Sequence, residues 1–201
     1  MKNKILLKIK TDIENQYQNY SKDKIEEIMY GVEGIYITIT KAIIIFTIAI
    51  MTGIFKELLI LLLMFNFIRL FAFGMHAPNG TICLIISTII FIGCAYLSKV
   101  LVIPKNILYI LYLIALIIIS IYSPADTIKR PLIKRKKRIV FKILSILVTI
   151  LFFISSLIIK NNLIINSMII GLIIECVLIL PITYKIFKLP YKNYLSYGLN
   201  T

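Results

Sequence analysis

Residues 134–159 read KRKKRIVFKILSILVTILFFISSLII, five consecutive cations followed by a run in which Lys142 is the only charge. A helix needs about 20 apolar residues to cross the ~30 Å hydrocarbon core of a bilayer, and this run has that length. Lipid offers no partners to backbone N–H and C=O groups, so a helix is the element that such a run forms there. The stretch therefore predicts a membrane-spanning helix over 139–159 that follows a basic connection.

Five further apolar runs of similar length accompany this one. The second and fourth of the six runs are short, so a fold with four spans and two re-entrant or interfacial segments is the alternative. The sequence thus predicts an all-α polytopic membrane protein with about six transmembrane helices, residues 1–201 forming a single membrane domain and 35–182 its bundle. The expected spans are 35–55, 57–73, 82–102, 106–122, 139–159 and 163–182.

The composition also favours a membrane fold. The hydrophobic content is 60% and the mean hydropathy is +0.94, whereas soluble domains are about 45–50% apolar. The net charge of +14 does not indicate nucleic acid as a partner, because the 23 Lys and Arg lie mostly between and outside the apolar runs. Such a distribution is typical of topology signals and of contact with anionic membrane lipids. We find no cysteine spacing for a disulfide framework or metal site and no phosphate-binding glycine loop, so no metal or cofactor is expected.

The distribution of cations predicts the orientation. The connection 124–138 carries seven Lys and Arg against the single acid Asp126, which by the positive-inside rule places it in the cytoplasm. Counting spans from this loop places both termini there, with 183–201 as a cytoplasmic tail. In segment 1–34, Ile5, Ile9 and Ile13 recur at helical spacing, which predicts an amphipathic interfacial helix. We therefore expect a multi-pass protein of the cell membrane.

The connection between the second and third expected spans holds a candidate nucleophile. His76 is the only histidine of the chain, and Cys83 follows it by seven residues across a Pro-Asn-Gly turn signal. If Thr81 caps the third span, Cys83 lies in its first turn, where unpaired amides and the helix dipole favour a thiolate. His76 can then accept the thiol proton and later protonate a leaving amine. The plainer alternative is a packing cysteine beside a polar capping histidine.

Three stretches together resemble one known family. Residues 69–78, RLFAFGMHAP, are followed by Cys83; residues 30–33, YGVE, precede the first span; and YSPAD at 122–126 leads through KRPLI at 129–133 into the basic run. In order, spacing and expected sidedness, these stretches resemble the accessory gene regulator B (AgrB) family, membrane cysteine endopeptidases that process quorum-sensing propeptides. The resemblance covers nearly the whole chain.

This resemblance implies that Cys83 is the nucleophile and His76 the general base, acting on an AgrD-like propeptide at the cytoplasmic side. The thiolate would cleave a peptide bond near the carboxyl end of the propeptide, release the tail and hold the remainder as a thioester. An internal Cys or Ser of the propeptide would then close a thiolactone or lactone, an exchange that needs no nucleotide. The resemblance also suggests a homodimer as a state to test.

Three other residues are candidates for contacts at this site. Arg69 is interpreted as a clamp for a propeptide carboxylate, as a cation that favours the Cys83 thiolate, or as an interfacial snorkelling arginine. Glu33 is a candidate for the acid that orients His76, and Asp126 is its rival. Either acid can instead cap a helix or pair with a lysine.

The basic connection is a candidate binding segment. Lys129 and Arg130, with the run to Arg138, can bind the acidic tail that AgrD-like propeptides carry. The same residues also suit a topology determinant that touches anionic lipid, and the two interpretations are compatible.

Other polar residues leave further functions open. Glu175 lies inside the sixth expected span, where an ionisable group is costly, and Lys142 is its expected partner in a structural ion pair. Cys94 and Cys176 are interpreted as packing residues. A transporter or peptide exporter, with Lys41, Lys142 and Glu175 along its path, would keep transporting after Cys83→Ala. A non-enzymatic subunit that recruits partners would have no unusually reactive thiol.

Overall fold

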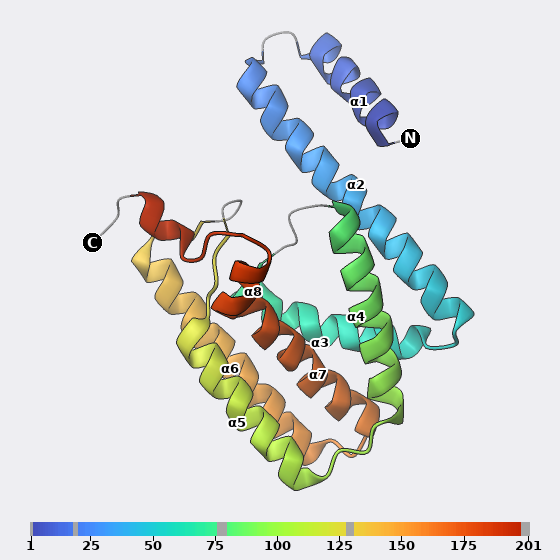
Figure 1. Cartoon of the computed structure of the whole chain (residues 1–201), viewed down its shortest axis with the longest axis vertical. Helices are drawn as coiled ribbons and strands as arrows, with labels where there is room; N and C mark the ends of the chain where they lie inside the picture. The colour runs from blue at the N-terminus through green and yellow to red at the C-terminus, as the bar shows by residue number, and fades with distance from the viewer. Residues whose placement is uncertain (1, 18–19, 76–79, 128–130, 198–201) are drawn as a thin grey trace. The chain divides into compact units, whose positions relative to one another are not determined.

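The computed structural model describes residues 2–17, 20–75, 80–127 and 131–197, which are helical except for short connections. The elements divide into two units, Met1–Thr47 and Ile48–Thr201, and each is described by itself. Figure 1 labels the helices in chain order. They are α1 (Lys2–Gln16), α2 (Lys22–Met51), α3 (Phe55–Ala72), α4 (Gly80–Val100), α5 (Lys105–Tyr122), α6 (Arg135–Ile158), α7 (Asn162–Ile179), α8 (Pro181–Ile186) and the 3-10 helix η1 (Asn193–Tyr197).

The first unit contains α1 and α2 as far as Thr47. The helix α2 begins at Lys22 and continues to Met51, so the expected boundary between residues 34 and 35 lies inside one helix. No proline interrupts this stretch, and a change from polar to apolar side chains does not by itself end a helix. The interfacial segment and the first span therefore share a continuous backbone.

The membrane character of the chain is evident in its helices. Within the described ranges, five helices are long and apolar enough to cross a membrane by length and composition, namely α2, α4, α5, α6 and α7. A further apolar helix, α3, has 18 residues and includes Lys56, Glu57 and Arg69. The prediction of an all-α polytopic membrane protein is confirmed.

The second unit is built around α7. In the most apolar window of α7 61% of the residues are buried, against 28% or less in the other four long helices. It contacts α3, α4, α5, α6 and α8, and Figure 1 shows it beside α6 and α3. A helix that is apolar on all sides is the expected occupant of such a central place. Its first turn is capped by Asn161, whose side-chain oxygen accepts from the amides of Leu163 and Ile164.

The contact between α3 and α7 positions the polar residues described below. At Gly171 of α7, an added Cβ would lie 3.1 Å from the backbone nitrogen of Phe65, so the two backbones approach closely. Small residues allow such approaches between helices in membranes. The buried side chains of α3 recur every three or four residues, as one packed face requires. They are Leu58, Leu61, Phe65, Ile68 and Ala72.

The basic connection is shorter than predicted. Because α6 begins at Arg135, the last four residues of the expected loop 124–138 are helical. Lysine and arginine are good helix formers, and the chain contains no proline after Pro131 to delay the helix. The guanidinium of Arg138 donates from Nη1 to the carbonyls of Leu132 (2.9 Å) and Ile133 (2.6 Å), which joins the loop to the helix.

Candidate functional site

The candidate nucleophile lies at the start of a helix. The helix α4 begins at Gly80, so Cys83 is in its first turn as predicted, where backbone amides have no partner within the helix. Thr81 was expected to precede the helix as its cap, and this is wrong because Thr81 lies inside the first turn. The Cys83 sulfur is partly exposed and lies 3.9 Å from the hydroxyl of Ser87. All three cysteines are described, and each is a thiol outside any disulfide.

His76 falls outside the described residues, as do Lys129 and Arg130. The residues directly before His76 are described, and they form an extended segment that we call the 73–75 strap. Its amides are held from two sides: Gly74 donates to the Ala125 carbonyl at 2.9 Å, and Met75 donates to the Leu178 carbonyl at 3.1 Å. The Ala125 amide in turn donates to the Ala72 carbonyl at 3.0 Å. The strap is therefore fastened both to the segment after α5 and to the end of α7.

A buried ion pair holds the other side of the strap. Arg69 Nη1 donates to Glu175 Oε2 at 3.0 Å, and Arg69 Nη2 donates to the Met75 carbonyl at 2.8 Å. The Glu175 side chain is fully buried and that of Arg69 is 15% exposed. The expected pair of Glu175 with Lys142 is therefore wrong, because α3 packs against α7 and brings Arg69 to Glu175, whereas Lys142 lines a pocket on α6. Burial of both partners makes this pair strongly dependent on its geometry.

Gly74 is required by this arrangement. Its φ is +91°, a region that residues with a Cβ rarely adopt, and an added Cβ would lie 3.0 Å from Arg69 Nη1. The same Cβ would lie 3.2 Å from Glu175 Oε1. Glycine thus allows the backbone of the strap to pass directly over the ion pair.

Asp126 connects the loop after α5 with the C-terminal segment. Its carboxylate accepts from the amides of Tyr194 at 2.8 Å, Asn193 at 3.0 Å and Leu132 at 3.4 Å. The Asp126 residue is only 2% exposed. Its printed contacts are with main-chain amides, which are the contacts of a structural capping group.

Tyr184 of α8 strengthens this connection. Its hydroxyl donates to the carbonyls of Asp126 at 3.1 Å and Ala125 at 3.3 Å. Burial, and next the nearby charge of Asp126, raise the pKa of Tyr184 well above its ordinary value. The hydroxyl therefore stays protonated and remains a donor to the segment that holds the strap.

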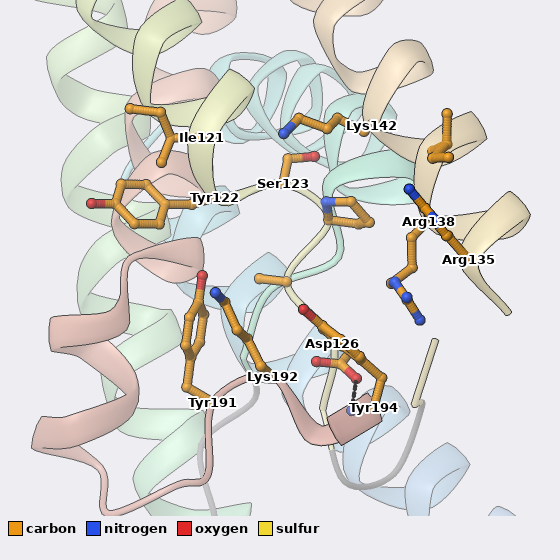
Figure 2. A pocket seen from close by; sticks show the side chains of 13 residues that line it. Ile121, Tyr122, Ser123, Asp126, Arg135, Arg138, Lys142, Tyr191, Lys192 and Tyr194 are labelled. Atoms are coloured by element: carbon orange, nitrogen blue, oxygen red, sulfur yellow. Dashed lines mark hydrogen bonds between the residues drawn. The ribbon is translucent and has the colours of Figure 1, made fainter. Parts of the chain in front are cut away.

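A cavity of about 290 Å³ opens on the other side of this segment. Figure 2 shows Lys142 projecting from α6 and Lys192 projecting from the C-terminal segment on opposite sides of it. Its cationic lining residues are Arg135, Arg138, Lys142 and Lys192.

Comparison with known proteins assigns the chain to a family. Residues 3–179 match the profile of the family described as Accessory gene regulator B. The chain belongs to the AgrB family. A putative AgrB-like protein of Clostridium acetobutylicum is 36% identical over 167 residues, covering 83% of this chain and 80% of the relative. Accessory gene regulator protein B of Staphylococcus saprophyticus is 34% identical over 169 residues, 83% of this chain and 88% of the relative. No solved structure matches the chain.

AgrB membership confirms the resemblance that the sequence motifs indicated. Of the residues predicted for the site, the structure places Arg69 on the strap and Asp126 beside Ala125, which bonds the strap. Glu33 lies on α2 in the first unit, and its role as an orienting acid stays a prediction.

Sequence reasoning missed three participants. It did not predict Tyr184 and Asn193, because a tyrosine or asparagine in a polar tail carries no signal of burial. It singled out Glu175 by its position in an apolar run but assigned it the wrong partner, since helix packing rather than spacing decides which cation it meets.

Proposed function

We propose that this AgrB-family chain is a membrane-embedded cysteine endopeptidase that cleaves an AgrD-like propeptide near its carboxyl end. Cys83 is the nucleophile and His76 the general base. The product is the precursor of a cyclic autoinducing peptide for quorum sensing.

The observation that carries this proposal is the position of Cys83 in the first turn of α4 in a chain of this family. The unpaired amides and the dipole at a helix start stabilise negative charge, so they favour a thiolate at this position. The strap supports the second role, because Arg69 and the amide of Met75 anchor the residue directly before His76 in the sequence. A base must be held within hydrogen-bond reach of the proton it takes, and a fastened backbone favours this.

The proposed reaction has two transfers. The Cys83 thiolate attacks the carbonyl carbon of the scissile peptide bond after His76 has taken the thiol proton, and His76 returns this proton to the departing amine. The propeptide remainder is then bound to Cys83 as a thioester. Attack by an internal thiol or hydroxyl of the propeptide forms a thiolactone or lactone and releases the Cys83 sulfur. Exchange of one thioester for another is nearly neutral in energy and therefore requires no nucleotide.

Partners and sidedness follow from the same proposal. Lys129 and Arg130 bind the acidic tail of the propeptide, and the basic segment also contacts anionic lipid. The excess of cations in 124–138 supports a cytoplasmic position for this loop, for both termini and for the active site. The family also supports testing for a homodimer, by crosslinking of the chain in native membranes.

The test is coexpression of the chain with its propeptide, with the masses of the cleavage products and of any propeptide adduct measured. Cys83→Ala and His76→Ala should abolish cleavage, and the adduct should be absent from Cys83→Ala. Cys94→Ala is the matched control, because Cys94 lies on the same helix and should leave cleavage unchanged. Cleavage by Cys83→Ala would refute the nucleophile, and an inert native chain that moves peptide across vesicles would favour an exporter.

A further inference from the structure

We propose that the cavity between α5, α6 and the C-terminal segment is a binding site for one anionic phospholipid. The phosphate of the lipid lies among Arg135, Lys142 and Lys192, and one acyl chain runs along α6 into an apolar groove. This goes beyond the proposed peptidase function and does not depend on it.

The cations of this cavity have no carboxylate to neutralise them among the described residues. The acid in the cavity wall, Asp126, accepts from three backbone amides, of Leu132, Asn193 and Tyr194. Arg138 is held by two carbonyls and lies over the Tyr194 ring, 4.1 Å from its centroid. The first turn of α6 contains no acid, so its cations oppose the positive end of the helix dipole. An anion in the cavity removes this unfavourable concentration of charge.

The surroundings of the cavity indicate an amphiphile rather than a soluble anion. Ile121 and Ile139 line the cavity and are 60% and 49% exposed, so apolar surface continues directly from the cationic end. Tyr122, Tyr191 and Tyr194 add rings with polar ends, which suit the boundary between headgroups and hydrocarbon. An acidic peptide would match the charges but not this apolar border. The observations therefore favour a lipid.

A second cavity completes the site. An open groove of about 300 Å³ lies between α5 and α6, lined almost entirely by apolar atoms, with Leu113, Thr149 and Phe153 among its residues. At 100° per residue, Thr149 and Phe153 share one face of α6 with Arg135 and Lys142. Seven residues separate Lys142 from Thr149, a rise of about 10 Å. An acyl chain that reaches the middle of a ~30 Å hydrocarbon core extends about 15 Å, which is enough to enter the groove.

The chain contains no tryptophan, so one introduced indole can report the lipid beside it. Leu113→Trp places the reporter in the groove at a residue that is 59% exposed, and Ile89→Trp places a control reporter on α4 at a residue that is 68% exposed. Each full-length variant is reconstituted in phosphatidylcholine vesicles that contain phosphatidylglycerol. Bromines are carried on the acyl chains of either one lipid or the other, at equal mole fraction. Quenching then gives the relative affinity for the two headgroups.

We expect brominated phosphatidylglycerol to quench the Leu113→Trp reporter several-fold more effectively than brominated phosphatidylcholine, and the Ile89→Trp reporter about equally. Adding Lys142→Gln or Arg135→Gln should reduce the preference by about fivefold at low salt, the effect expected for one cation near a lipid surface. Lys137→Gln is the matched control, because it removes the same charge from the same helical turn but lies on the opposite face of α6. High salt should weaken the preference of the chain that carries the reporter alone, which requires no charge variant.

Equal quenching of Leu113→Trp by both lipids would overturn the proposal. An equal loss of preference in Lys137→Gln would also overturn it, because it would indicate general attraction to the basic segment rather than a site. If a soluble decapeptide of Asp and Glu binds with a dependence on Lys142 while the lipid preference is absent, the cavity is a peptide site and the proposal is wrong. Binding is the readout throughout, so failure of the peptidase proposal would leave this result unchanged.

Discussion

Gly74→Ala is the substitution that tests the geometry of the strap most directly. The backbone of Gly74 has a φ of +91°, and a left-handed conformation costs a residue with a Cβ about 1–2 kcal/mol. The new methyl group would also lie 3.0 Å from Arg69 Nη1 and 3.3 Å from the Leu178 carbonyl oxygen. The arginine can move away, but it then gives up part of a charged hydrogen bond worth about 1.5–3 kcal/mol. We expect the free energy of unfolding to fall by about 3 kcal/mol in all.

The same change should slow propeptide cleavage. A displaced strap carries His76 with it, and a misplacement of about 1 Å at a catalytic group costs about 100-fold in rate. Stability is measured by titrating the reconstituted full-length chain with sodium dodecyl sulfate and following its circular dichroism. The cleavage rate is measured with coexpressed propeptide under identical expression.

Gly93→Ala provides the matched control on α4. An added Cβ at Gly93 meets nothing within 4 Å, and alanine is a better helix former than glycine by about 0.5–1 kcal/mol. The two alanine substitutions should therefore change stability in opposite directions. If Gly74→Ala matches the native chain in stability and cleavage, the described strap geometry is not that of the working protein.

Three further changes test the contacts around the strap. Glu175→Gln leaves Arg69 buried without its counter-charge and should destabilise the chain by about 3 kcal/mol, and the double variant with Arg69→Gln should recover part of this loss in the same titration. Asp126→Ala leaves three amides without their acceptor and should make the segment after α8 sensitive to protease, whereas Asp12→Ala on the exposed face of α1 should not. Tyr184→Phe removes one donor shared by two carbonyls and should cost about 1 kcal/mol in the titration.

The sequence alone determined the fold class and the family. Long apolar runs in lipid can form only helices, because the backbone must satisfy its own hydrogen bonds there. For that reason the helices α4, α5, α6 and α7 agree closely with the expected spans. Charge and polarity are weaker guides to helix ends, which is why α2 begins before the expected span and α6 begins inside the expected loop.

Only the tertiary structure decided which polar residues meet. Spacing along the chain places Glu175 and Lys142 in neighbouring spans, but the close approach of α3 to α7 at Gly171 brings Arg69 to Glu175 instead. The same holds for Asp126, whose amide partners come from a segment nearly seventy residues later. Such contacts depend on the relative rotation and depth of packed helices. Local periodicity defines which face of a helix is apolar, but it does not define which helix that face will contact.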